Sequence, residues 1–244
     1  MINIVIPMAG AGSRFKTAGY QIPKPFIDIN GKMMIEHVLD CVQISDATYT
    51  LIIQEQFKKK YQEKLERISK NYRIKFITVE RLTQGACCTA LASHTIINNE
   101  NTVIFVDSDN FFSNKAFKNF IEYSKKRKLD GCLLTFNTNE DCFSFAQTND
   151  IGYVVKTAEK EVISNHAIAG VYMFSKGSDF VSCAIEAIIY GDKSKNEYYM
   201  SNVYNWAIKH GLKIGVFDVD KRDWICVGTP QKLEEFIKLS NNIK

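Results

Sequence analysis

Short apolar runs of strand length alternate with helical patterns through the first half of this 244-residue chain. Between two such runs, Ile35, Val38, Leu39 and Val42 recur at the spacing of one helix face. A strand–helix rhythm of this kind predicts a Rossmann-like α/β fold, in which helices sandwich a mostly parallel sheet. We expect strands at residues 2–6, 49–53, 74–79, 102–106 and 131–136. We expect one helix that follows the strand at 49–53 and ends at about residue 68, and two more over 86–97 and about 115–126.

The alternation of strand and helix patterns ends in the second half of the chain. Residues 137–165 are polar and irregular, and we expect only one short strand there, at 152–155. No internal repeat or linker interrupts the chain, which predicts one domain over residues 1–244 with an α+β elaboration in its second half. The remaining expected elements are a long strand at 167–174, helices at about 178–189 and 198–209, short strands at 213–217 and 224–227, and a helix at 230–239.

Composition excludes several classes of protein. The formal charge of +4 is mild, and the lysine runs at 58–60 and 125–128 have the character of solvated helix faces, so no nucleic-acid partner is expected. Seven cysteines form no C-x-x-C pair and four histidines show no metal spacing, which favours reduced thiols and no zinc. No leader precedes the first strand and no apolar run approaches ~18 residues, so we expect a cytoplasmic protein without a membrane partner.

The loop that follows the first strand, within "MAGAGSRFKTAGYQIPKPF", has the small residues of a phosphate-binding loop. Gly10, Ala11, Gly12 and Ser13 allow backbone amides to face a polyphosphate. A dinucleotide-binding loop would have a third glycine at position 15, and no Gly-Lys-Ser/Thr of a Walker loop is present. Arg14 ends the loop with a fork suited to phosphate. A tight turn with a surface arginine remains the alternative.

Carboxylates follow the strands at two further places. Asp107-Ser108-Asp109-Asn110 comes directly after the strand at 102–106, where two carboxylates can reach one divalent cation; a solvent-exposed capping turn is the alternative. Near the C-terminus, one of Asp218, Asp220 and Asp223 could complete the shell of that cation, and spacing does not decide which. Ligands of open parallel sheets bind beyond the carboxyl ends of the strands. Together with Arg14 and Lys24, these features predict phosphoryl or nucleotidyl transfer.

The segment "IVIPMAGAGSRF…PKPFIDINGKMMIEHVL" resembles the signature of the nucleotidyltransferases that join a nucleoside triphosphate to a small phosphorylated metabolite. That resemblance implies a glycosyltransferase-A-like nucleotidyltransferase fold, with residues 1–112 as the nucleotide-binding half and 113–244 as the acceptor-binding half. Met33 stands where the family usually has proline. Arg14 and Lys24 take the catalytic positions, and the implied nucleotide-binding residues are Ala9, Gly10, Ala11, Gly12, Ser13, Gln84, Gly85 and Ser108.

Later segments extend the resemblance. "VDSDN" resembles the metal-binding turn of the family, which makes Asp109 the principal ligand of Mg2+. "EKEVISNHAIAGVYMF" implies that Lys160 meets the acceptor phosphate, and "EYYMSNVYNWAIKHG" also resembles a late motif of relatives. We take Asn165 and Glu197 as further candidate acceptor contacts; a satisfied polar position at the strand end is the alternative for Asn165.

One position departs from the sugar-1-phosphate members. They carry W-x-D-x-G-T, whose aspartate binds the cation, and here Cys226 fills that position. A thiol is a poor ligand for magnesium. Cytidylyltransferase relatives carry an aspartate three residues earlier, which matches Asp223 and makes it the expected second ligand. The chain accordingly looks similar to CTP:phosphoglutamine cytidylyltransferases of capsule phosphoramidate synthesis.

The resemblance thus implies a Mg2+-dependent transfer from CTP to phosphoglutamine that releases pyrophosphate. Two other enzyme activities stay open: a hexose-1-phosphate uridylyl-, thymidylyl- or cytidylyltransferase, and a metal-dependent glycosyltransferase that uses Asp107-Ser108-Asp109 to hold a nucleotide sugar. A non-catalytic nucleotide-binding regulator is a third alternative. The oligomeric state is open as well, with a homodimer as one option.

Overall fold

The computed structural model describes residues 1–191 and 193–241, so residue 192 and the last three residues of the predicted domain lie outside the described part. The strands are β1 (Ile2–Pro7), β2 (Asp28–Ile29), β3 (Lys32–Met33), β4 (Ala47–Gln54), β5 (Ile74–Val79), β6 (Thr102–Val106), β7 (Asn110–Phe112), β8 (Gly131–Asn137), β9 (Ser144–Thr148), β10 (Val154–Glu159), β11 (His166–Phe174), β12 (Ile214–Asp218) and β13 (Trp224–Cys226). The helices are α1 (Ser13–Thr17), α2 (Met34–Cys41), α3 (Gln56–Lys60), α4 (Gln62–Asn71), α5 (Ala86–Leu91), α6 (His94–Ile97), α7 (Asn114–Lys126), α8 (Gly177–Ile189), α9 (Met200–Lys209) and α10 (Pro230–Asn241), with 3-10 turns η1 (Lys24–Phe26) and η2 (Lys221–Asp223).

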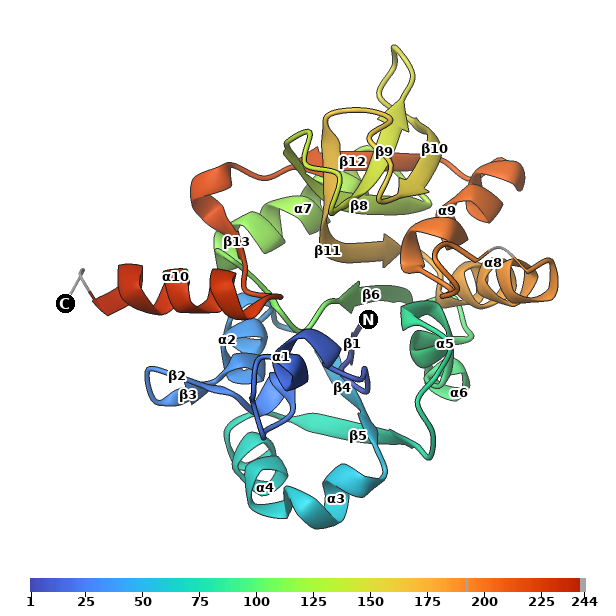
Figure 1. Cartoon of the computed structure of the whole chain (residues 1–244). Coiled ribbons are helices and arrows are strands. Elements are labelled where there is room, and N and C mark those ends of the chain that lie inside the picture. The colour runs from blue at the N-terminus through green and yellow to red at the C-terminus, as the bar shows by residue number, and fades with distance from the viewer. Residues whose placement is uncertain (192, 242–244) are drawn as a thin grey trace.

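One large sheet of nine described strands runs through the molecule (Figure 1). Strands β5, β4, β1 and β6 are parallel neighbours in that order. Strand β11 then pairs antiparallel with both β6 and β8, and β12 pairs parallel with β8. The expected Rossmann-like, mostly parallel sheet is therefore confirmed.

Apolar side chains of the central strands alternate between two hydrophobic clusters, one on each face of the sheet. In β1, Ile4 and Ile6 pack into the cluster under α2 and α7, whereas Val5 packs into the cluster under α5, α8 and α9. Figure 1 shows these two helix layers on opposite sides of the sheet. Strands buried on both faces need continuous apolar runs, which is why their positions were readable from the sequence.

The second half holds more sheet than the sequence predicts. Residues 137–165, expected to be irregular with a short strand at 152–155, contain two strands, β9 and β10, that pair antiparallel. This expectation was wrong because the ribbon lies at the edge of the sheet and is partly exposed, so its strands mix polar and apolar residues without a clear period. The helix expected over 86–97 is also divided, into α5 and α6.

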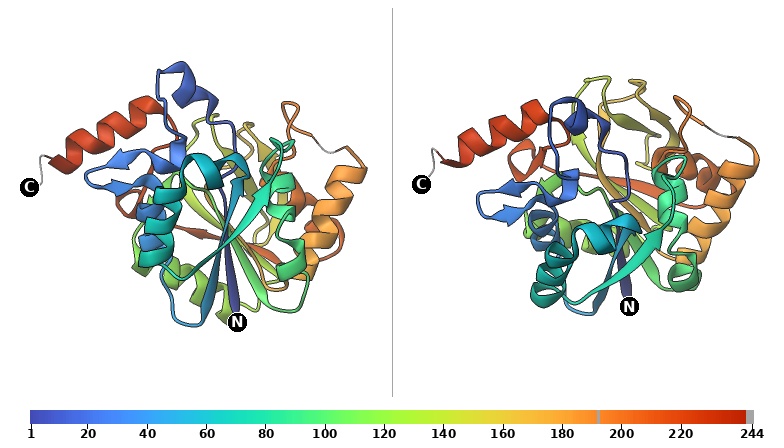
Figure 2. Two further views of the ribbon diagram at one scale, coloured as in Figure 1. Left: turned by 90° about the horizontal axis from the view of Figure 1, so that it is seen from below. Right: turned by 60° about the horizontal axis from the view of Figure 1, so that its bottom comes forward.

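A small hairpin, β2–β3, was not foreseen either. Its two-residue turn, Asn30-Gly31, has positive φ at both positions (54° and 89°), the conformation that a type I′ turn requires. Figure 2 shows the C-terminal helix α10 beside this hairpin, where Asn30 Nδ2 donates to Ser240 Oγ at 2.8 Å. Phe236 of α10 also packs on Phe111 of β7, with ring centroids 5.4 Å apart. The end of the chain thus docks against its beginning.

Candidate active site

The loop after β1, residues 8–14, here called the glycine loop, is fixed to the end of β4. Met8 N donates to Ile52 O at 2.9 Å, and Gln54 Nε2 donates to Ala9 O at 2.8 Å. Gly12 has φ +61°, a left-handed conformation that favours glycine and turns the chain into α1. The carboxyl ends of two parallel strands therefore hold this loop in place.

The glycine loop presents backbone donors that no described residue accepts. The amides of residues 9–14 make no hydrogen bond within the described part of the chain. Residues 10–14 are partly or fully exposed, so these donors are open to a ligand from solution. Consecutive amides of this kind form a concavity suited to an anion such as a polyphosphate.

Lys24 is held by the two prolines beside it and by an aromatic anchor. Pro23 precedes the 3-10 turn η1, and the fully buried ring of Phe26 packs on Phe57 and Tyr61 at centroid distances of 5.5 and 5.3 Å. The Nζ atom of Lys24 forms an ion pair with Asp109 Oδ2 at 2.7 Å. The turn thereby brings a lysine to a residue 85 positions later in the sequence.

That ion pair is largely shielded from water, with 22% and 18% of the two side chains exposed. Burial on its own would lower the pKa of Lys24, but the carboxylate of Asp109 outweighs this effect and the pKa is raised. Lys24 therefore carries its positive charge at neutral pH.

The turn that connects β6 to β7 carries Asp107 and Asp109 into the same space. Asp107 N donates to Gly170 O at 2.8 Å, and Gly170 has φ +74°. A Cβ at Gly170 would lie 2.8 Å from Asp107 Oδ2, so glycine leaves room for this carboxylate. Burial, together with the charge of Asp109, raises the pKa of Asp107 to about 8.

A cavity of about 530 Å3, here called the central cavity, opens in front of this turn. It contains acidic and basic groups side by side, as expected of a site for a cation and a phosphorylated ligand. Its charged lining residues are Arg14, Asp107, Asp109, Glu140, Glu159, Lys160 and Lys232.

Lys160 also lines the central cavity. Its Nζ donates to Tyr199 Oη at 3.1 Å, and its backbone has φ +54°. The neighbouring carboxylate of Glu159 is buried and accepts hydrogen bonds at Oε2 from Ser144 Oγ and, at 3.0 Å, from Ser201 Oγ. Burial raises the pKa of Glu159. The sequence analysis missed Glu159, although its position next to Lys160 was the available signal.

Gln84 and Gly85 lie on the chain segment that leads into α5. Tyr198 N donates to Gln84 O at 2.8 Å, and Lys193 Nζ donates to Gln84 Oε1 at 2.8 Å. Gly85 has φ +132°, and a Cβ there would lie 2.4 Å from Tyr198 O. Glycine at position 85 is thus required by both conformation and space.

Asp223, the expected second metal ligand, does not lie with Asp109. In the β7–β13 ladder, Val227 N donates to Asp109 O at 2.9 Å, whereas Ser113 N donates to Asp223 O at 3.0 Å. The two aspartates are therefore at opposite ends of the ladder, roughly 13 Å apart at ~3.3 Å per residue. Asp223 is exposed and does not line the central cavity.

Cys226, by contrast, lines the central cavity near Asp109. Burial, with the charge of Asp109, raises the pKa of this thiol to about 11, so it stays protonated at neutral pH. The other two aspartates near the C-terminus have partners of their own. Asp218 Oδ1 accepts from Thr135 Oγ1 and His166 Nδ1, and Asp220 pairs with Arg222 at 2.8 Å.

The carboxylates present suit a hard cation. In the described ranges, 1–191 and 193–241, no group of three or more His, Cys, Asp and Glu side chains is arranged to hold a metal. Mg2+ needs no such group, because it is usually bound by one or two carboxylates together with substrate phosphates and waters. Asp109 and Asp107 both line the cavity, and their carboxylate oxygens could hold such an ion.

Five further residues expected at the site, outside the glycine loop, do not line the central cavity: Gln84, Gly85, Ser108, Asn165 and Glu197. Ser108 is buried in the β6–β7 turn, Asn165 is exposed before β11, and Glu197 is exposed in a bridge with Ser194. The structure therefore brings Arg14, Asp109 and Lys160 together around this cavity, with Lys24 joined to it through Asp109. It does not bring Gln84, Gly85, Ser108, Asn165, Glu197 or Asp223 to the lining of this cavity.

Comparison with known proteins agrees with this geometry. The family model described as "Nucleotidyl transferase" matches residues 4–242, so the chain belongs to that family. Among curated proteins, it is 25% identical to the bifunctional protein GlmU of Clostridium tetani over 96% of this chain and 51% of the relative. It is 24% identical to the mannose-1-phosphate guanyltransferase of Hypocrea jecorina over 70% of this chain and 49% of the relative. The chain thus spans about half the length of the curated relatives it matches.

Solved structures show the same fold over nearly the whole chain. The nucleoside-diphosphate-sugar pyrophosphorylase of Vibrio cholerae RC9 superposes with a TM-score of 0.83 at 24% identity, covering 96% of this chain and 99% of the other. The inositol-1-phosphate CTP transferase of T. maritima has a TM-score of 0.75 at 16% identity, covering 99% and 96%. None of the helices in the described part of the chain has the length and apolar character needed to cross a membrane.

Proposed function

We propose that this chain catalyses Mg2+-dependent nucleotidyl transfer from a nucleoside triphosphate to a small phosphorylated acceptor, with release of pyrophosphate. One observation carries the proposal: the unpartnered amides of residues 9–14 meet the buried Lys24–Asp109 pair at the carboxyl edge of the sheet. Residues 1–112 would bind the nucleotide and residues 113–244 the acceptor.

The glycine loop and its cations would bind the triphosphate. The amides of residues 9–14 would donate to the β- and γ-phosphates, and Arg14 would contact the triphosphate from the central cavity. Lys24, charged and held at the same edge, would exchange its contact with Asp109 for one with the α-phosphate. Such groups contribute because they are already placed where charge develops in the transition state.

Asp109, together with Asp107, would hold Mg2+. When bound, this ion would neutralise negative charge on the reacting phosphates. Asp109, once it held the cation, would release Lys24 to turn towards the nucleotide.

The acceptor would bind in the central cavity. Lys160 would contact its phosphate, and Glu159 Oε1, which makes no hydrogen bond to a described residue, would accept one from the remainder of the molecule. The acceptor phosphate needs no general base, because the second pKa of a phosphate monoester is about 6 and the attacking oxygen is ionised at neutral pH.

We also propose CTP as the nucleotide and phosphoglutamine as the acceptor, with Gln84 and Gly85 beside the base. This part rests on the sequence resemblance. The Asp223 register that favoured a cytidylyltransferase loses support, since Asp223 lies away from Asp109. A hexose 1-phosphate acceptor with UTP or dTTP is therefore the first alternative to include in an assay.

A pyrophosphate-release assay tests the proposal. Purified protein with Mg2+ would be given each of CTP, UTP, dTTP, GTP and ATP against phosphoglutamine and a set of hexose 1-phosphates. We expect pyrophosphate only when one triphosphate and one phosphorylated acceptor are present together, and only with the divalent cation. Consumption of nucleotide sugars without pyrophosphate release would instead support a glycosyltransferase, and binding without turnover would support a regulator.

A further inference from the structure

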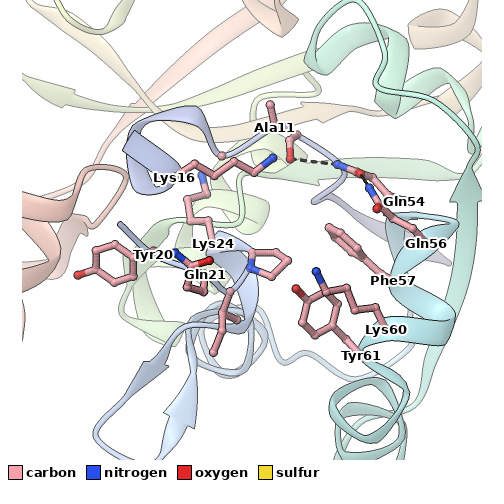
Figure 3. Close-up of a pocket in the computed structure, with 14 residues that line it drawn as sticks. Ala11, Lys16, Tyr20, Gln21, Lys24, Gln54, Gln56, Phe57, Lys60 and Tyr61 are labelled. Atoms are coloured by element: carbon pink, nitrogen blue, oxygen red, sulfur yellow. Dashed lines mark hydrogen bonds between the residues drawn. The ribbon is translucent and has the colours of Figure 1, made fainter. Parts of the chain in front are cut away.

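A second pocket, which shares no lining residue with the central cavity, lies against residues 10–12 of the glycine loop (Figure 3). It has a volume of about 270 Å3 and is here called the lysine pocket. The loop forms one wall and α3 the facing wall, so that Lys16 and Lys60 approach the space from different elements. The lining residues are Gly10, Ala11, Gly12, Lys16, Tyr20, Gln21, Ile22, Pro23, Lys24, Gln54, Gln56, Phe57, Lys60 and Tyr61.

The charged side chains of the two spaces differ. The lysine pocket contains three lysines and no carboxylate, whereas four carboxylates and three basic side chains line the central cavity. Within the described ranges neither Lys16 nor Lys60 has an acidic partner, and the Nζ of Lys60 lies 5.6 Å from the centre of the Tyr61 ring. A small polyanion is therefore attracted to the lysine pocket, where no carboxylate opposes its binding.

Lys24 joins the two spaces. Its stem lines the lysine pocket beside Gly12, and its Nζ reaches Asp109 on the wall of the central cavity. If the α-phosphate of the nucleotide lies at Lys24, the acceptor in the central cavity approaches it from one side. In-line displacement then requires the leaving group on the other side.

We propose that the lysine pocket receives the leaving pyrophosphate, with Lys16 and Lys60 as its binding residues. This inference rests on the proposed function. An acceptor phosphate oxygen forms the new bond to the α-phosphorus while the α–β bridging P–O bond breaks. The electron pair of that bond leaves with the pyrophosphate, whose added charge Lys16 and Lys60 neutralise. Gln54 and Gln56, at the end of β4 and the start of α3, add amide groups to the lining.

Direct binding of pyrophosphate tests this assignment without depending on turnover. Isothermal titration calorimetry with pyrophosphate would compare the wild type with Lys16→Ala, Lys60→Ala and the double variant. We expect each single variant to bind pyrophosphate roughly tenfold more weakly, the size expected for losing one charge-assisted contact, and the double variant more weakly still. Both side chains are exposed, so unchanged thermal unfolding is the folding control.

Lys59→Ala is the matched control, because Lys59 is on the same helix and does not line the lysine pocket. Lys160→Ala is the second control, since its ammonium faces the central cavity. Both should bind pyrophosphate as the wild type does. No binding by the wild type, equal affinity in all variants, or a loss confined to Lys160→Ala would overturn the inference. Failure of the proposed function would appear separately, as pyrophosphate binding without pyrophosphate release from any triphosphate and acceptor.

Discussion

A Lys24→Ala variant is expected to lose at least about a hundredfold in kcat while keeping its fold. Removing one preorganised charge donor from a transition state typically costs about a hundred- to a thousandfold. Lys24 is suited to such a role because Pro23, Pro25 and the buried Phe26 fix its backbone, and because its charge is retained beside Asp109. Initial rates of pyrophosphate release at saturating nucleotide would measure the effect.

Lys32→Ala is the matched control for this change. Lys32 also forms an ion pair, with Asp40 at 2.6 Å, but both side chains are about half exposed and lie away from the central cavity. Surface pairs of this kind contribute little, so its activity and thermal stability should stay near those of the wild type. A Lys24→Ala enzyme with near-normal kcat would remove Lys24 from the mechanism.

Asp109→Asn is expected to have a comparable effect through the metal. The amide keeps the shape of the side chain but loses the charge that attracts a divalent cation, so we expect kcat to fall at least about a hundredfold. The Mg2+ concentration for half-maximal activity should rise as well. A titration of activity against Mg2+ separates this effect from a loss of nucleotide binding, which is measured with the triphosphate alone.

The same titration of activity against Mg2+ shows whether Asp107 or Asp223 is the second ligand of the ion. Asp107→Asn should resemble Asp109→Asn, because Asp107 lines the same wall of the cavity, whereas exposed Asp223 lies at the far end of the β7–β13 ladder. Asp223→Asn is therefore expected to keep the Mg2+ dependence of the wild type. The reverse order, with Asp223→Asn impaired and Asp107→Asn normal, would restore Asp223 as the ligand.

Much of the fold could be predicted because the central strands are buried on both faces. Such strands must be apolar throughout, and the alternation of Ile4, Ile6 and Val5 between the two clusters follows directly from burial on both sides. The β9–β10 ribbon could not be predicted in the same way, because partly exposed edge strands mix polar and apolar residues. The β2–β3 hairpin did carry a signal, the Asn30-Gly31 turn.

Some features of the candidate site could likewise be predicted from the sequence, and others could not. The proximity of Lys24 and Asp109 follows from the rule that loops at the carboxyl ends of parallel strands meet, and from the family signature. The position of Asp223 depends instead on the register of β13 against β7, which no local pattern encodes. The lysine pocket also escaped sequence reasoning. Lys60 belongs to a run of lysines whose sequence pattern is typical of a solvated helix face. Only the folded structure shows that Lys60 lines a pocket together with the glycine loop.

The most direct test of the central claim is phosphorus NMR of the complete reaction. The purified protein, Mg2+, a nucleoside triphosphate and the phosphorylated acceptor identified by the pyrophosphate-release assay would be followed over time. We predict equal amounts of free pyrophosphate and of a new product whose two phosphorus atoms are joined by one bridging oxygen. Orthophosphate in place of pyrophosphate, or pyrophosphate without the diphosphate-linked product, would contradict nucleotidyl transfer.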